Sequence, residues 1–170
     1  MSPAVAGNAR TGLDPRPISE IVEHARETTT ILIATVAPEI YNDLNGLLQP
    51  FSIHTIWAKG VEAAKRILAK QKIDACLCGF WLQDGTYREL VRHIRRESME
   101  IPLVLVSEPD GPHEYRDYLA AMNIGALDFL CHPYKKTDLE GILRLAIGAQ
   151  AGSVPKQASL VDPDLHPRAA

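Results

Sequence analysis

The sequence has no apolar run long enough to cross a membrane. Its longest runs, 31–38 and 101–106, are far shorter than the ~20 residues that a membrane-spanning helix needs. Residues 1–17 lack the apolar centre of a secretory signal. The 3 cysteines are an odd number and too few for a disulfide framework, which favours a reducing compartment. We therefore expect a cytoplasmic protein without membrane contact.

The chain also lacks a strong excess of charge of one sign. Its 18 Lys and Arg residues stand against 21 Asp and Glu residues, for a net charge of −3. Nothing in this balance favours nucleic acid or an anionic membrane as a partner. Apolar residues make up 46% of the 170 residues and charged residues 23%, as in ordinary globular proteins. The length predicts one domain with additional segments.

The prolines indicate where those segments lie. Of the 12 prolines, 6 fall before residue 30 or after residue 149, where large apolar side chains are also sparse. We expect flexible tails over 1–16 and 150–170, because such segments bury too little surface to offset the entropy of ordering. Over 17–29 we expect a short amphipathic helix and a linker, since Ile18, Ile21, Val22 and Ala25 share one helical face.

Strand and helix patterns alternate over the predicted domain, 30–149. Apolar strand-like runs occur at 30–36, 52–57, 73–78, 101–106 and 127–131, the third followed by an Asp84-Gly85 turn signal. Helical stripes occur at 40–48, 61–68, 87–94, 115–122 and 139–147, the last preceded by a capping-box pattern, Thr137 to Glu140. This alternation predicts an α/β fold, a doubly wound five-stranded parallel sheet with helices on both faces and the flavodoxin-like strand order 2-1-3-4-5.

Four segments over 30–149 resemble the receiver domain of bacterial response regulators. Ala58-Lys-Gly-Val-Glu-Ala-Ala64 is similar to the family's Gly-x-Glu-Ala segment, and Gly79-Phe-Trp-Leu-Gln-Asp-Gly85 stands where the family has Asp-x-x-Leu-Pro-Asp-Gly. Ile101 to Ser107 resembles the fourth strand with its terminal hydroxyl. Gly125-Ala-Leu-Asp-Phe-Leu-Cys-His-Pro-Tyr134 is similar to Gly-Ala-x-Asp-Tyr-Leu-x-Lys-Pro-Phe, with Pro133 at the family's cis-proline position.

The resemblance fails at the residues that carry the family's chemistry. The acidic pair that holds Mg²⁺ falls on Thr35 and Val36, and the phosphate-accepting aspartate falls on Gly79. The lysine that neutralises the phosphate falls on His132, and only the hydroxyl is retained, as Ser107. These five residues form a degenerate phosphorylation pocket. The resemblance therefore implies a pseudo-receiver of a two-component system that is not phosphorylated on Asp and is not an enzyme. We expect it to need no cofactor or metal and to act by contact with a signalling protein.

Adjacent aromatic residues follow the position of the missing aspartate. Phe80 and Trp81 either fold over the vacated pocket or are presented to a partner. In the family, an aromatic residue on the fifth strand follows the movement of the hydroxyl, and that switch position is Phe129 here.

Other surface residues are candidate partner contacts. Arg88, Arg92, Arg95 and Arg96 fall on one helical face, which is either solvated or turned to an anionic partner. The absence of interleaved aromatics argues against nucleic acid. The resemblance also offers a homodimer contact through the fourth helix, fifth strand and fifth helix, where Tyr115 and Tyr118 lie.

The cysteines allow two interpretations. Cys76 and Cys78 lie two apart on one predicted strand, and Cys131 precedes His132, so a metal site or a redox pair is conceivable. Burial of the first two as small core side chains is favoured, because they lie within an apolar strand. His132 is favoured as a plain loop histidine over a proton switch.

A different class of function competes with signalling. A flavodoxin-like domain could bind or convert a small molecule in the crevice at the carboxyl ends of its strands. Against this, no glycine-rich phosphate loop follows the first strand, whose end is Ala34-Thr-Val-Ala-Pro38. The sequence leaves open whether the chain is a stand-alone adaptor or a piece of a longer protein.

Overall fold

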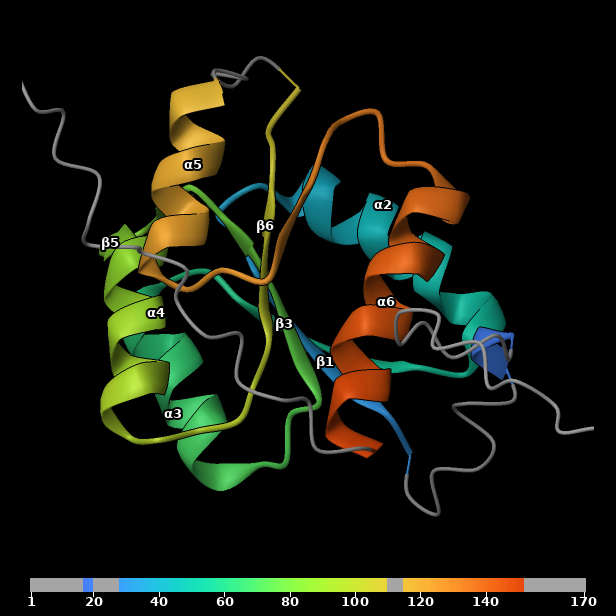
Figure 1. Cartoon of the computed structure of the whole chain (residues 1–170), viewed down its shortest axis with the longest axis horizontal. Helices are drawn as coiled ribbons and strands as arrows, with labels where there is room; N and C mark the ends of the chain where they lie inside the picture. Colours follow the sequence, from blue (N-terminus) through green and yellow to red (C-terminus); the bar gives the residue numbers. More distant parts are fainter. Residues whose placement is uncertain (1–16, 20–27, 110–114, 152–170) are drawn as a thin grey trace, which may run out of the picture.

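One parallel sheet of five strands forms the centre of the domain (Figure 1). The computed structural model describes residues 17–19, 28–109 and 115–151. The strand order is β2-β1-β3-β6-β7, which confirms the predicted order 2-1-3-4-5. The strands are β1 (Thr30–Ala34), β2 (His54–Ala58), β3 (Ala75–Gly79), β6 (Leu103–Val106) and β7 (Asp128–Leu130).

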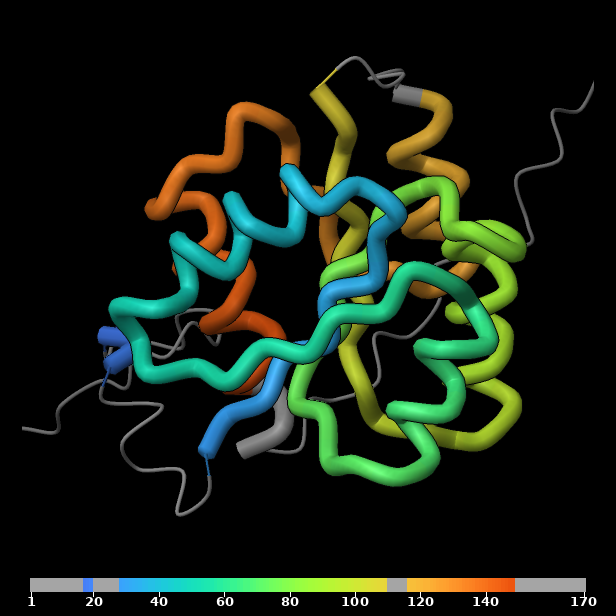
Figure 2. The backbone as a smooth tube through the Cα atoms, turned by 180° about the vertical axis from the view of Figure 1, so that it is seen from behind, coloured from blue at the N-terminus to red at the C-terminus, as the bar shows by residue number. Residues whose placement is uncertain are grey.

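Helices cover both faces of the sheet, as expected of right-handed crossovers between parallel strands (Figures 1 and 2). One face carries α2 (Pro38–Leu48), the short 3-10 helix η1 (Gln49–Phe51) and α6 (Lys136–Ala151). The other carries α3 (Val61–Lys70), α4 (Tyr87–Arg96) and α5 (Tyr115–Ile124). Helix α6 extends past the expected domain end at residue 149, because Ala149, Gln150 and Ala151 are good helix formers.

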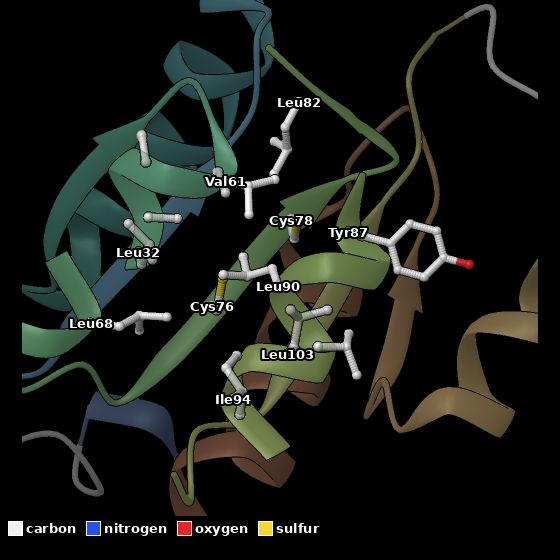
Figure 3. Close-up of a cluster of buried hydrophobic side chains, with 14 of the residues drawn as sticks. Leu32, Val61, Leu68, Cys76, Cys78, Leu82, Tyr87, Leu90, Ile94 and Leu103 are labelled. Atoms are coloured by element: carbon white, nitrogen blue, oxygen red, sulfur yellow. The ribbon is translucent and has the colours of Figure 1, made fainter. Parts of the chain in front are cut away.

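Alternate residues of the buried strands supply two hydrophobic clusters, one on each face. Ile31 and Ile33 point to the α2 and α6 side, whereas Leu32 and Ala34 point to the α3, α4 and α5 side (Figure 3). Both sides of β1 are therefore buried, which explains why its sequence is a continuous apolar run rather than an alternating one.

The predicted N-terminal helix falls only partly within the described residues. Ile18 and Ser19 are helical, and Ile18 is 3% exposed within the cluster between α2 and α6. Ile21, Val22 and Ala25 lie outside the described residues, as do 1–16 and 152–170 of the expected tails.

A small antiparallel hairpin follows β3, where the sequence predicted a turn at Asp84-Gly85. Its strands are β4 (Trp81–Leu82) and β5 (Gly85–Thr86), with Trp81 opposite Thr86. The expected turn is therefore shifted by one residue, because Gly85 pairs with Leu82 and the turn itself is Gln83 and Asp84.

The predicted capping box at Thr137 was wrong. Helix α6 begins at Lys136, so Thr137 is a helical residue and not the residue that precedes the helix. A capping box does exist at the start of α4, where the Thr86 hydroxyl accepts a bond from Arg88 N and the Glu89 carboxylate accepts one from Thr86 N at 2.8 Å.

Candidate functional site

Residues at the ends of four strands lie at the carboxyl edge of the sheet. Thr35 and Val36 follow β1, Gly79 ends β3, Ser107 follows β6 and His132 follows β7. Because these strands are parallel neighbours, the structure brings together at one edge all five residues of the degenerate phosphorylation pocket predicted from the sequence. In open α/β sheets this edge is where ligands bind.

Thr35 is held by the backbone around it. Its side chain is 1% exposed, and its hydroxyl oxygen accepts a hydrogen bond from Ala37 N at 3.2 Å. Its own N–H donates to Ala58 O at 2.9 Å, and Trp57 Nε1 donates to Thr35 O at 2.9 Å. The next residue, Val36, is exposed. This first position of the site thus supplies a buried neutral hydroxyl.

Gly79 occupies the centre of this edge. A Cβ atom built on it would lie 3.7 Å from both Ala34 O and Thr35 Oγ1 and 3.8 Å from Trp81 O. These are ordinary van der Waals distances, so the backbone here does not require glycine. The site therefore has space for a Cβ atom at this position, and the sequence provides none.

Ser107 is buried, with 0% of its surface exposed, and all of its polar groups have partners. Its hydroxyl oxygen accepts from His132 N at 2.7 Å, and its N–H donates to Leu130 O at 2.9 Å. The Tyr134 hydroxyl donates to Ser107 O. Burial, aided by the charges of Asp43 and Glu108, raises the pKa of Tyr134 well above its ordinary value, so the phenol remains a donor. The peptide bond between His132 and Pro133 is cis, as the resemblance implied.

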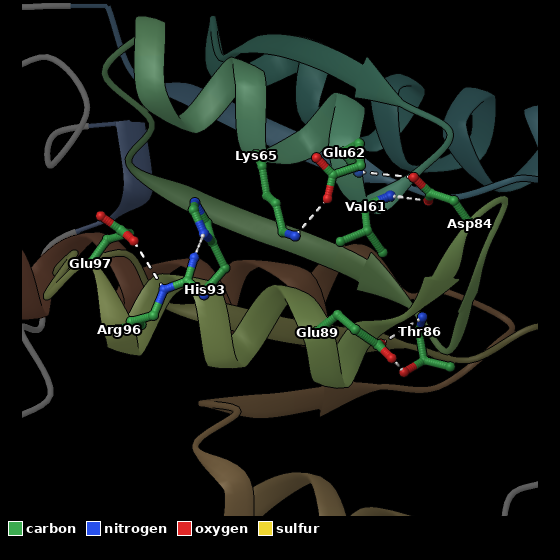
Figure 4. Close-up of polar contacts among 9 residues, drawn as sticks. All are labelled: Val61, Glu62, Lys65, Asp84, Thr86, Glu89, His93, Arg96 and Glu97. Carbon is green, nitrogen blue, oxygen red and sulfur yellow. Dashed lines mark hydrogen bonds and ion pairs between the residues drawn. The ribbon is translucent and has the colours of Figure 1, made fainter.

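The carboxylates on either side of Gly79 in the sequence are engaged elsewhere. Asp84 caps α3: Oδ1 accepts from Val61 N at 2.5 Å and Oδ2 from Glu62 N at 3.0 Å (Figure 4). These two hydrogen bonds lower the pKa of Asp84, and the bond from Glu62 N has the larger effect. Asp74 precedes β3 at the opposite edge of the sheet, where its Oδ2 accepts from Thr30 N at 2.7 Å. Within the described ranges, no three His, Cys, Asp or Glu side chains are grouped to hold a metal ion.

Phe80 and Trp81 point in different directions. Phe80 is half-buried and packs edge-on against Tyr87, with ring centroids 5.4 Å apart, and against Phe129, at 5.6 Å. Phe129 in turn contacts Tyr118 at 6.3 Å. Trp81 is 60% exposed. Phe80 therefore packs inward against aromatic neighbours, and Trp81 lies at the surface. That either residue covers the vacated pocket or contacts a partner stays a prediction.

The hairpin that carries Trp81 is attached at several points. Gln83 N donates to Lys59 O at 2.9 Å, and Tyr87 N donates to Phe80 O at 3.2 Å. The Asp84 cap ties the turn to α3, and the Thr86 capping box ties its end to α4. Trp81 is thus displayed from a braced segment, which lowers the conformational entropy lost on binding.

The four arginines of α4 do not form one uniform stripe. Arg88 lies over the Tyr87 ring at 5.5 Å, and Arg96 Nε is 3.1 Å from Glu97 Oε1 (Figure 4). The Arg95 guanidinium lies against Gly125, where a Cβ atom would be 2.7 Å from it. Arg92 is exposed. The side chain of Tyr115, another candidate partner contact, lies outside the part of the chain that the structure describes.

Two of the three cysteines belong to the core. Cys76 and Cys78 are fully buried in the cluster beneath α3 and α4 (Figure 3). Burial raises the pKa of Cys76 to about 12 and that of Cys78 well above its ordinary value. Neutral thiols of this kind are poor metal ligands and poor nucleophiles. Cys131 is exposed.

Comparison with known proteins indicates the fold. No family model matches the chain. It is 27% identical over 116 residues to the response regulator protein PilR of Pseudomonas aeruginosa, an alignment that covers 68% of this chain and 25% of PilR. The chain thus spans about a quarter of that protein.

Solved structures give the same result. The signal receiver domain of an HD domain-containing protein from Pseudomonas fluorescens Pf-5 matches with a TM-score of 0.66 at 21% identity, over 74% of this chain and 98% of that one. A two-component response regulator from Clostridium difficile matches with a TM-score of 0.65 at 24% identity, over 74% of this chain and 100% of that one. The chain therefore has the fold of response regulator receiver domains.

Proposed function

We propose that this domain is a signalling module that acts by contact with a protein partner and is not phosphorylated at the carboxyl edge of its sheet. The observation that carries the proposal is Gly79, which stands at the end of β3 without a side chain. An acyl phosphate needs a carboxylate nucleophile, and this position has none.

The surrounding residues support the same conclusion. Mg²⁺ prefers carboxylate and other oxygen ligands, whereas Thr35 and Val36 carry no charge, so the residues present do not fit the metal of the receiver family. Asp84 cannot replace the missing nucleophile without giving up both of its bonds to α3. The hydroxyls of Thr35 and Ser107 already accept backbone N–H groups, which also disfavours the alternative of a small-molecule site or a catalytic site here.

Partner contact is assigned to the exposed face of the β4–β5 hairpin. Trp81 combines high exposure with a braced backbone, and tryptophan is enriched among residues that dominate binding energies. Arg88 and Arg92 on the adjoining helix provide a basic flank. The name of PilR as a response regulator supports a signalling role within a two-component system. The homodimer through α5, β7 and α6, which the resemblance to receiver domains implies, is part of the proposal.

The test is incubation of the purified protein with Mg²⁺ and acetyl phosphate, followed by mass spectrometry and thermal unfolding. We expect no phosphate adduct and no Mg²⁺-dependent shift of the melting temperature. An adduct on Asp74, Asp84 or any other aspartate of the wild-type protein would overturn the proposal.

A matched variant tests whether the missing carboxylates are the reason why this site does not bind Mg²⁺. Val36→Asp combined with Gly79→Asp places carboxylates at two adjacent strand ends, and a Cβ atom at position 79 meets its neighbours at ordinary van der Waals distances. We expect this variant to fold and to be stabilised by Mg²⁺, by roughly 1.4 kcal/mol at ten times its Kd. A wild-type protein that responds to Mg²⁺ as strongly as the variant would contradict the proposal.

A further inference from the structure

Strand β2 leaves one edge of the sheet open. It pairs only with β1, and the bonds from His54 N to Thr29 O and from Thr35 N to Ala58 O, both 2.9 Å, turn the even-numbered residues of β2 toward β1. In a parallel ladder the N–H and C=O of the residues between them point the other way. The backbone groups of Thr55 and Trp57 therefore face outward, and neither has a backbone partner in the described part of the chain.

This edge carries few of the features that keep a strand edge from pairing. β2 reads His-Thr-Ile-Trp-Ala, with no proline, lysine or carboxylate. Native proteins usually protect open edges with such residues, with bulges or with a covering segment. The strand is five residues long, enough to accept another strand.

The two faces of the sheet next to β2 differ in how far side chains cover them. On the α2 side, the Trp57 ring stacks on Tyr41 at 4.9 Å with an interplanar angle of 10°, and Lys59 Nζ lies 4.7 Å from the Trp57 centroid. This stack fills the space next to β2. On the α3 side, Ile56 faces the same way as its β1 partner Leu32 and is only partly buried.

A groove of about 320 Å³ lies on the flank of α3, the helix that follows β2. Ile56 of β2 packs against the same hydrophobic cluster as two residues of this groove, Ala63 and Ile67. Ala63 and Ile67 give it an apolar floor, and Arg66, Lys70 and Gln71 line the rest. Lys65 lies on the opposite flank, toward α4 (Figure 4). Arg66 and Lys70 have no carboxylate within ion-pair distance among the residues that the structure describes, whereas Lys65 pairs with Glu62 at 2.6 Å. The groove therefore joins apolar surface to two unpaired cations.

We propose that β2 and this groove bind an extended acidic segment of a partner protein, which adds to the sheet as a strand. Its backbone would bond to Thr55 and Trp57, and an apolar side chain would cover Ile56 and Ile67. Arg66 and Lys70 are one helical turn apart, about 6 Å along the axis. Carboxylates at i and i+2 of a strand are about 6.8 Å apart, so two such residues can meet both cations. None of these residues belongs to the hairpin that carries Trp81.

The probe is the capped peptide Thr-Val-Thr-Glu-Thr-Glu-Thr, titrated into the full chain labelled with ¹⁵N. We expect the amide signals of Thr55 and Trp57 to shift. The same peptide with lysines in place of the glutamates should bind at least tenfold more weakly. Arg66→Glu combined with Lys70→Glu should weaken binding of the acidic peptide at least tenfold, and Arg88→Glu combined with Arg92→Glu is the control with the same change in net charge.

Thr55→Pro tests the strand itself, because it removes an outward N–H and no bond to β1. Circular dichroism and the melting temperature establish that the variant is folded. Loss of binding by this folded variant supports strand addition. Three results would overturn the proposal: no shift at Thr55 or Trp57 with the acidic peptide, equal binding of the lysine peptide, or full binding by both the Thr55→Pro and the charge-reversed proteins. None of these results bears on whether the carboxyl edge of the sheet is phosphorylated.

Discussion

Gly60 and Asp84 depend on each other across 24 residues of sequence. A Cβ atom on Gly60 would lie 2.6 Å from Asp84 Oδ1, which accepts the N–H of Val61. Gly60 precedes α3 and contributes no side-chain cap of its own, so a carboxylate from the hairpin provides the cap. The first turn of α3 and the hairpin that carries Trp81 are therefore fixed to each other by one side chain.

We predict that Gly60→Ala displaces the Asp84 carboxylate and destabilises the domain by about 1 kcal/mol or more, the ordinary cost of a lost helix cap. The matched control is Gly46→Ala in α2, where a Cβ atom would meet nothing within 4 Å. That substitution should stabilise the protein by about 0.5 to 1 kcal/mol, because alanine is the better helix former. Urea unfolding measures the change in the free energy of unfolding for each substitution. Equal changes for the two substitutions would contradict the role of Asp84 as the cap.

The same cap should make stability depend on pH. The N–H groups of Glu62 and Val61 lower the pKa of Asp84, and bonds from Thr86 lower the pKa of Glu89. A carboxyl group with a lowered folded-state pKa contributes stability above its unfolded pKa of ~4, and loses it as the pH falls through the lower folded value. The urea midpoint of the wild-type protein should therefore fall between pH ~7 and pH ~3.

The paired variant Asp84→Asn with Glu89→Gln isolates this contribution. It should be less stable than the wild type at neutral pH, because neutral amides accept the backbone N–H groups more weakly. The difference between the two proteins should shrink as the pH falls, since the wild-type carboxylates become protonated. A difference that stays constant across the range would show that these carboxylates carry no linked protons.

The cysteines give a third prediction. Cys76 and Cys78 are fully buried with raised pKa values, whereas Cys131 is exposed. Iodoacetamide at pH ~8 reacts with thiolates, so the native protein should be alkylated at Cys131 before the other two. In urea all three should react. Peptide mapping distinguishes the sites, and rapid native alkylation of Cys76 or Cys78 would show that the β3 core opens.

The architecture could be predicted because each of its elements is encoded locally. A continuous apolar run such as 101–106 indicates a strand buried on both sides, and alternation of such runs with helical stripes fixes a parallel sheet. The positions at the carboxyl edge then follow from strand ends, which is why Thr35, Gly79 and Ser107 were brought together as expected.

The details of the site could not be predicted, because they depend on tertiary contacts. Two Thr-x-x-Glu patterns occur, at Thr86 and Thr137, and only the exact start of each helix decides which one caps. The partners of Asp84 are more than 20 residues away in the sequence. Nothing local separates Phe80 from Trp81 either, since both are large aromatics of one short segment.

The proposed function makes its sharpest prediction at that pair. Phe80 is packed between Tyr87 and Phe129, so Phe80→Ala should destabilise the domain by about 2 kcal/mol. Trp81 is 60% exposed, so Trp81→Ala should change the free energy of unfolding by no more than about 0.5 kcal/mol. If Trp81 anchors a partner, the same substitution should weaken that complex at least tenfold, in line with hot-spot energies of about 2 kcal/mol.

Calorimetric titration with a partner captured from the native host measures the second effect, and urea unfolding measures the first. Asn42→Ala serves as the control, because its exposed side chain lies on α2, which covers the other face of the sheet. A Trp81→Ala protein that unfolds earlier and binds normally would mean that the ring supports the fold. If Trp81→Ala changes neither stability nor affinity, the partner binds elsewhere than at the hairpin. We expect Phe80→Ala to lower stability and Trp81→Ala to lower affinity. The two effects differ because the Phe80 ring packs inward, whereas the Trp81 ring is held in solvent.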